Sequence, residues 1–148
     1  MARTYRLSPG TRAVNWVFAA MTTAGVGASC RHILTVRGRT TGRPHSTPVD
    51  VIEAAGQRWL VAGYGPSNWA RNARAAGEVT LRRGRSSQRY TVTEPGPSET
   101  VPVLRRYMTQ IRVTRPYFDA APDSPDDDAI KAELPRHPVF QLTPAGRP

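Results

Sequence analysis

The stretch Val36–Pro48, VRGRTTGRPHSTP, decides the fold. The apolar segment 33–36 before it is typical of a strand, and extended chain resumes at Ser46. Gly38 and Gly42 permit positive φ, so backbone N–H groups can turn inward and form an anion-binding concavity between two strands. The loop also offers guanidinium and hydroxyl donors from Arg39, Thr40, Thr41 and Arg43. The residues alone fit a phosphate site and a solvated basic hairpin equally well.

The composition predicts one domain over residues 1–148 that needs no disulfide or metal ion to fold. The chain has one cysteine and three histidines among 148 residues. A single cysteine excludes an internal disulfide, and the scattered histidines have no metal-ligand spacing. Cys30 stands where a strand begins, which favours a buried apolar role.

The charge is strongly positive, with a formal net value of +10 at pH 7. The arginines lie mostly before residue 116, and the acidic residues gather after it. The arginine-rich part of the chain before residue 116 should attract an anionic partner: nucleic acid, anionic lipid or a polyanionic small molecule. A nucleic-acid platform is disfavoured because the aromatic residues are not interleaved with the basic ones, so no specific nucleic acid is expected.

The N-terminal segment 11–24 is predicted to be an amphipathic helix. Its apolar stripe consists of Val14, Val17, Phe18 and Met21. The apolar run is interrupted and lacks a cleavage motif, so an export signal is not expected. No stretch has the roughly 20 apolar residues of a membrane span. We therefore expect a cytoplasmic protein. The N-terminal helix could also give it peripheral contact with a membrane.

Alternating apolar residues and turn signals predict about six antiparallel strands. The expected strands cover 32–37, 48–53, 58–62, 79–82, 89–93 and 138–142, with hairpin turns at 54–57 and 83–87. Three helices are expected, including the N-terminal one. This pattern indicates a mainly β domain with flanking helices, an α+β fold built on a small antiparallel barrel.

The other two helices are predicted over 67–76 and 98–112. Ser67 should cap the first and Gly77 should end it, while Ser98 should cap the second. In the first helix Trp69 and Asn72 share a face, where they could form the wall and polar clamp of a planar ligand. The alternative is that Trp69 is core and Asn72 bonds a loop carbonyl. The acidic, proline-rich residues 113–137 are expected to form a loop.

With these motifs in order, the chain resembles the deazaflavin-dependent nitroreductase family. The matching stretches are 34–44 through Pro48, Trp69–Ala75 with the strand 78–81, and His137–Phe140. The resemblance covers roughly residues 12–142. It implies a split β-barrel of the FMN-binding kind and a reduced deazaflavin, coenzyme F-420, as cofactor, with FMN less expected. Homodimers are usual among similar proteins.

The resemblance also implies a set of site residues. The coenzyme phosphate would lie in the Gly38–Gly42 loop, held by Arg39, Thr40 and Thr41 beside Gly42 and His45. The ring would be flanked by Thr47, Pro48, Ala62 and Tyr64, with Trp69 and Asn72 completing the site. Tyr64 and Tyr117 are candidate proton donors by position, and Tyr117 and Phe118 lie where similar enzymes place substrate-pocket aromatics. No metal is implied.

The implied activity is hydride transfer from reduced coenzyme F-420 to an electron-poor small molecule: a quinone, a nitro compound or an enone. The cofactor carries the hydride, so the site needs geometry more than a catalytic base. The alternative from the same residues is a non-catalytic barrel that binds a fatty acid or another apolar ligand. The family commonly has Lys at the Thr40 position and Arg at the His45 position, and a basic residue where Gly65 stands.

Overall fold

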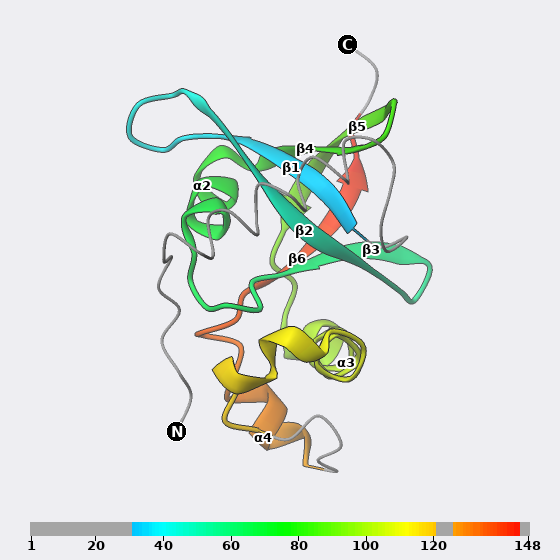
Figure 1. The fold of residues 1–148 in the computed structure, drawn as a ribbon. Coiled ribbons are helices and arrows are strands. Elements are labelled where there is room, and N and C mark those ends of the chain that lie inside the picture. Colours follow the sequence, from blue (N-terminus) through cyan, green and yellow to red (C-terminus); the bar gives the residue numbers. More distant parts are fainter. Residues whose placement is uncertain (1–30, 121–125, 146–148) are drawn as a thin grey trace.

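The computed structural model describes residues 31–120 and 126–145, which form an antiparallel β-barrel with helices around it (Figure 1). Strands β1 (Arg31–Arg37), β2 (Pro44–Ala54) and β3 (Gln57–Val61) follow one another as two hairpins. The β2–β3 turn has positive φ at Ala55 (54°) and Gly56 (71°), which matches the right-handed twist of the flanking strands.

The remaining strands close the barrel. They are β4 (Glu78–Arg83), β5 (Ser86–Thr93) and β6 (Val139–Pro144), and the order around the barrel is β1-β2-β3-β6-β5-β4. β1 pairs with β4, and β6 joins β3 to β5, all antiparallel. The predicted barrel of six antiparallel strands is therefore confirmed, and β2 begins at Pro44 rather than near Pro48 because its residues 44–50 pair with β1.

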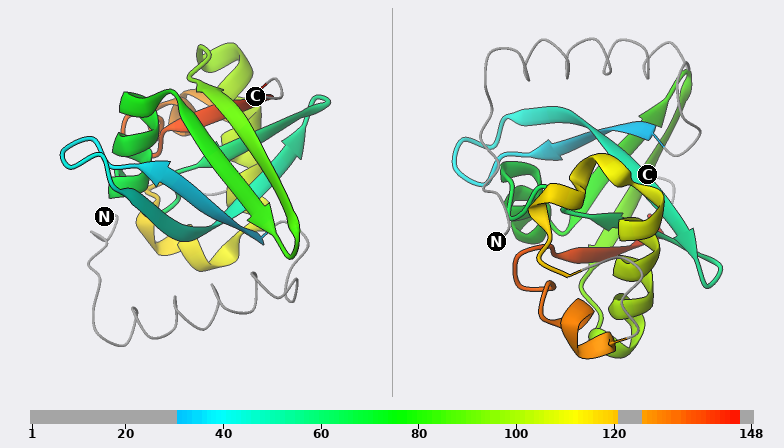
Figure 2. Two further views of the ribbon diagram at one scale, coloured as in Figure 1. Left: turned by 90° about the horizontal axis from the view of Figure 1, so that it is seen from above. Right: turned by 60° about the horizontal axis from the view of Figure 1, so that its bottom comes forward.

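Helix α2 (Asn68–Ala76) lies at one end of the barrel (Figure 2). Ala70 and Ala73 belong to the same apolar cluster as the inward-facing barrel residues, and Trp69 packs against this cluster. Gly77 ends the helix with a φ of 73°, as predicted. The predicted side-chain cap is wrong: Ser67 occupies the N-cap position, yet its side chain makes no capping hydrogen bond.

Helix α3 (Pro97–Gln110) packs outside the barrel against β2, β3 and β6. Its N-cap is Gly96 rather than the predicted Ser98, because Pro97 takes the first helical position, where its missing N–H and fixed φ are favourable. Pro102 is tolerated near the N-terminal end of this helix.

The prediction of a loop over 113–137 is wrong at two segments and holds for 118–120, 126 and 132–137. A 3-10 helix, η1, covers Arg112–Tyr117, and a short helix, α4, covers Asp127–Lys131. Asp126 caps α4 by accepting a hydrogen bond from the N–H of Asp128. Two aspartates in the first turn interact favourably with the positive end of the helix dipole. Composition suggested a loop, whereas local capping and burial of Ile130 produce a helix.

The molecule has two apolar cores that meet at β2 and β3. Val51 and Leu60 point into the barrel, while Ile52 and Trp59 lie in the cluster under α3. Both faces of these strands are therefore buried, which explains why Val51 and Ile52 are both apolar. The predictions for the helix 11–24 and for Cys30 concern residues outside the part that the structure describes.

Candidate functional site

The β1–β2 loop has a closed backbone geometry. The N–H of Gly38 donates to the carbonyl of Arg43 at 2.8 Å, and that of Gly42 donates to the carbonyl of Gly38 at 3.0 Å. A Cβ on Gly38 would lie 2.9 Å from Nε2 of His45, so a side chain there would displace the histidine. Gly42 has a φ of 75°, which glycine adopts without strain. The predicted positive φ is seen at Gly42 and not at Gly38, and the N–H groups of both glycines bond carbonyls within the loop instead of turning inward.

Arg39 is tied to helix α2 through Asn72. The Oδ1 of Asn72 accepts from the backbone N–H of Arg39 at 3.0 Å and from its Nη1 at 2.7 Å. Asn72 is buried, with 4% of its surface exposed. The predicted bond of Asn72 to a loop carbonyl is replaced by bonds of its Oδ1 to a loop N–H and a guanidinium. Asn72 therefore fixes the loop and orients its arginine.

The loop after β3 presents the first of two tyrosines. Gly63 is required there, because a Cβ on it would lie 2.0 Å from the hydroxyl oxygen of Tyr107. Burial raises the pKa of Tyr107, so its hydroxyl stays protonated; a side-chain hydrogen bond with Thr114 acts in the opposite direction. Tyr64 follows and meets Tyr117 of η1 edge-on, with ring centroids 5.1 Å apart. Two segments far apart in sequence thus form one aromatic wall.

These parts line one cavity of about 1120 Å³. The predicted site residues that line it are Arg39, Thr40, Thr41, His45, Thr47, Pro48, Tyr64, Trp69, Asn72 and Tyr117. We call the part formed by Gly38–Thr41 the loop side and the part formed by Tyr64 and Tyr117 the tyrosine side. Trp69 also packs against Phe140 at 5.9 Å between centroids. Both interpretations of Trp69, cavity wall and core, therefore apply.

Two predicted site residues do not line this cavity. Ala62 is 1% exposed, and its carbonyl accepts hydrogen bonds from the N–H of Gly65 and from His137. Gly42 lies at the outer turn of the loop and supports its shape. The family resemblance implied that Ala62 flanks the ring, but its side chain belongs to the apolar cluster inside the barrel.

The cavity also has lining residues that sequence reasoning did not select: Gly65, Ser67, Arg71, Arg136 and His137 among them. Ser67 Oγ is buried without a hydrogen-bond partner among the described residues. Arg136 donates from Nη2 to Asp119 at 2.7 Å and to the buried carboxylate of Glu133 at 3.1 Å. His137 begins a stretch that carries the family resemblance, but its position before a proline has no periodic signal, and the fold is what brings its side chain to the cavity.

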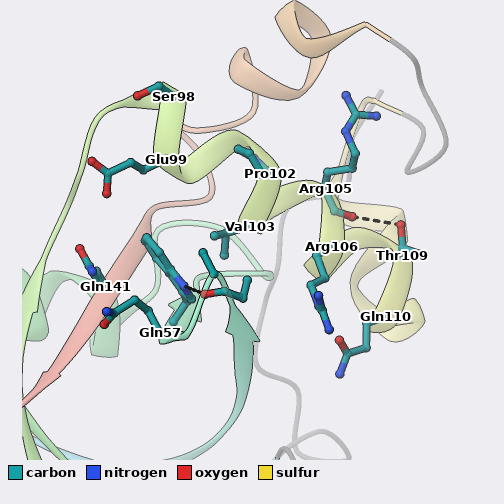
Figure 3. A pocket seen from close by; sticks show the side chains of 13 residues that line it. Gln57, Ser98, Glu99, Pro102, Val103, Arg105, Arg106, Thr109, Gln110 and Gln141 are labelled. Carbon is teal, nitrogen blue, oxygen red and sulfur yellow. Dashed lines mark hydrogen bonds between the residues drawn. The ribbon is translucent and has the colours of Figure 1, made fainter.

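A second cavity of about 780 Å³ lies between α3 and the β2–β3 hairpin (Figure 3). Its side chains come from α3 on one side and from Gln57 and Gln141 on the other (Figure 3). Trp59 forms part of it and donates from Nε1 to the carbonyl of Ala54 at 3.0 Å. None of the predicted site residues lines this cavity, which separates it from the candidate site.

Within 31–120 and 126–145, no group of three or more His, Cys, Asp or Glu residues is arranged to hold a metal ion. No helix in these ranges has the length and apolar character needed to cross a membrane.

A family model described as F420H(2)-dependent quinone reductase matches residues 11–121. The chain belongs to this family. As an F420-dependent reductase it is an oxidoreductase, and the cofactor expected from the sequence, coenzyme F-420, is the one that the family uses. A search of curated proteins finds no match.

Solved structures share the fold of this F420-dependent reductase at low sequence identity. A domain-swapped dimer is 20% identical with a TM-score of 0.57, and the match covers 92% of this chain and 100% of that one. The heme storage protein HutZ from Vibrio cholerae is 12% identical with a TM-score of 0.53, covering 97% and 93%. A protein of unknown function from Agrobacterium tumefaciens is 20% identical with a TM-score of 0.54, covering 97% and 58%. These likenesses show the fold alone.

Proposed function

We propose that the protein transfers a hydride from reduced coenzyme F-420 to an electron-poor small molecule: a quinone, a nitro compound or an enone. The observation that carries the proposal is the cavity of about 1120 Å³, because a donor-rich loop and a tyrosine pair both line it. Its size suits a cofactor together with a small acceptor.

The loop side fits the anionic groups of the coenzyme. Arg39 is held by Asn72 through Nη1, and its other guanidinium nitrogens are available to a phosphate. The N-terminus of α2 lines the same cavity, has no acidic residue in its first turn, and carries the unpartnered Ser67 Oγ. Backbone N–H groups at a helix N-terminus favour an anion. We place the phosphate between Arg39, Thr40, Thr41 and this helix.

The tyrosine side suits the acceptor. When bound, the coenzyme supplies the hydride. Pro48 and Trp69 would hold the ring of the coenzyme, and the residues of the tyrosine side would orient the acceptor and exclude water. After hydride transfer the reduced acceptor needs a proton, and the hydroxyls of Tyr64 and Tyr117 are the donors that we propose for it.

Oxidation of the reduced coenzyme, followed by absorbance, tests this function. We expect turnover with at least one of three acceptors, a naphthoquinone, a nitroarene and a cyclic enone. Tyr64→Phe and Tyr117→Phe should lower kcat, on the order of 10²-fold for the true donor. The matched control is Tyr90→Phe, since Tyr90 lies in the barrel outside the cavity.

A fatty acid serves as the competing ligand in the same experiment. Saturable fatty-acid binding with no coenzyme binding and no turnover would overturn the proposal and favour a carrier. A homodimer stays a prediction, which light scattering on the purified protein tests.

A further inference from the structure

His137 joins two segments of the cavity wall. Its ring is buried, with 1% of the residue exposed. Nδ1 lies 2.8 Å from the carbonyl oxygen of Ala62, and Nε2 lies 2.9 Å from that of Tyr117. The ring of Phe118 stacks on the imidazole, with centroids 3.7 Å apart and planes 15° apart. One side chain therefore connects the end of β3 to the end of η1.

The connected segments carry the tyrosine pair. Tyr64 lies two residues after Ala62, and Tyr117 itself supplies the carbonyl that faces Nε2. Both tyrosines lie outside the barrel strands, Tyr64 in a loop and Tyr117 at the end of a 3-10 helix. The ladder hydrogen bonds of the barrel thus do not set their separation, and contacts such as those of His137 must do so.

Glu133 holds the next residues of the same segment. Its Oε1 accepts from the backbone N–H groups of Asp119 at 3.0 Å and Ala120 at 3.1 Å. Its Oε2 lies 3.6 Å from Nε2 of His137, and Arg136 donates to both carboxylate oxygens. Glu133 is 2% exposed. Burying a carboxylate and an imidazole is costly, and apolar residues of similar size stabilise a fold as well or better, so the network indicates a requirement for geometry.

The number of ring protons decides how many of these bonds form. Burial lowers the pKa of His137 below its ordinary value, while the carbonyls of Ala62 and Tyr117 and the carboxylate of Glu133 raise it and Arg136 lowers it. A neutral ring has one N–H and donates to one carbonyl, whereas a doubly protonated ring donates to both. The doubly protonated ring therefore bonds both segments, and the neutral ring bonds one of them.

We propose that His137 is a positioning residue that holds Tyr117 edge-on against Tyr64 and thereby sets the fit of the acceptor on the tyrosine side. The effect on the acceptor rests on the proposed function. The edge-on packing of the Tyr64 and Tyr117 rings is a property of the protein without any ligand. Removing the imidazole should therefore separate the tyrosine rings and weaken acceptor binding, and should leave the loop side unchanged.

The experiment compares the wild type with His137→Phe, which keeps the stacking on Phe118 but removes both ring nitrogens. The first readout is the NOE between the rings of Tyr64 and Tyr117 in the ligand-free protein, measured with labelled tyrosine. The second is the KM for the acceptor, and the third is the Kd for the coenzyme. The matched control is Ile130→Val, a buried position of α4 outside the hydrogen-bond network. If His137→Phe does not fold, His137→Asn, which retains a donor, replaces it.

We expect His137→Phe to lose the NOE and to raise the acceptor KM about tenfold or more, with the coenzyme Kd within about twofold of wild type. Ile130→Val should keep the NOE and the KM. For His137→Asn, partial retention of the NOE is the expected result. An NOE that persists in the folded variant would overturn the inference. Absence of coenzyme binding in the wild type would instead refute the proposed function, and the NOE would still decide the role of His137.

Discussion

At the scale of single residues, close approaches explain several choices in this sequence. Gly38 and Gly63 are both positions where a Cβ would collide with a neighbouring side chain, His45 in one case and Tyr107 in the other. Arg39 and Asn72 form a direct link between the loop and α2. Small or polar residues at these points bring the β1–β2 loop, the β3 end and α2 around one cavity.

Gly63→Ala should destabilise the fold by about 1–3 kcal/mol, because the added methyl group overpacks against the buried Tyr107. Urea unfolding measures the change. A double-mutant cycle with Tyr107→Phe provides the control, since removal of the hydroxyl oxygen takes away the closest contact. The substitution should cost less in the Phe background, and an equal cost in both backgrounds would contradict the packing explanation.

At the scale of elements, the turn of the β2–β3 hairpin has a strained backbone conformation at Ala55. Ala55 has a φ of 54°, the one positive φ of a non-glycine residue in the described ranges, and Gly56 follows at 71°. Both central residues of this tight turn are left-handed, an arrangement for which Asn-Gly is strongly preferred. The hairpin thus forms with a less favourable residue at its first turn position.

Ala55→Asn should stabilise the protein by about 0.5–1 kcal/mol, because Asn adopts the left-handed conformation at lower cost than Ala. The midpoint of thermal unfolding should rise accordingly. Ala55→Ser is the matched control: it adds a polar group at the same exposed position without the backbone preference of Asn. A rise of the same size in the control would mean that turn conformation is not the cause.

The elements also show which features the sequence could predict. The barrel strands were predictable because alternation and turn residues are local signals, and Gly77 ended α2 as expected. Local signals placed the start of α3 at Ser98, whereas the helix begins at Pro97. They also missed η1 and α4. The burial of Ile130 stabilises α4 through contacts distant in sequence, which no local pattern contains.

The same limit applies to the site. Arg39, Thr40 and Thr41 were predictable from the glycine-bounded loop, and Trp69 from its helix face. His137 and Arg136 reach the cavity only because β6 pairs with β3 and brings the preceding turn beside Gly65. Ala62 was expected at the ring, but the strand places it inside the barrel. The direction of a side chain at a strand end depends on register, which the sequence left open.

At the scale of the whole molecule, burial of His137 makes stability depend on pH. The folded state binds this proton at a lower pH than the unfolded state, whose histidine has the ordinary pKa of 6.5. Stability is therefore highest above about pH 6.5, decreases as the pH falls toward the folded pKa, and levels off below it. His137→Asn should lack this component. Urea unfolding across this range measures the difference, and a wild type that gains stability relative to the variant on acidification would contradict it.

The whole molecule is basic, and its cavity is lined by Arg39, Arg71 and Arg136 and by the N-terminus of α2. We propose that the loop side binds the phosphate of coenzyme F-420. If so, affinity depends on Arg39 only when the ligand carries the phosphate. Arg85, at the tip of the β4–β5 hairpin and outside the cavity, offers a matched arginine that changes net charge equally.

The most direct measurement is a calorimetric titration of the wild type, Arg39→Ala and Arg85→Ala with the coenzyme and with its ring portion lacking the phosphate. We predict that Arg39→Ala weakens coenzyme binding by about 1.5–3 kcal/mol, the usual contribution of a hydrogen bond to a charged group, and leaves binding of the phosphate-free ring unchanged. Arg85→Ala should match the wild type with both ligands. Equal coenzyme affinity in all three proteins, or an equal loss with both ligands in Arg39→Ala, would contradict the placement of the phosphate in the β1–β2 loop.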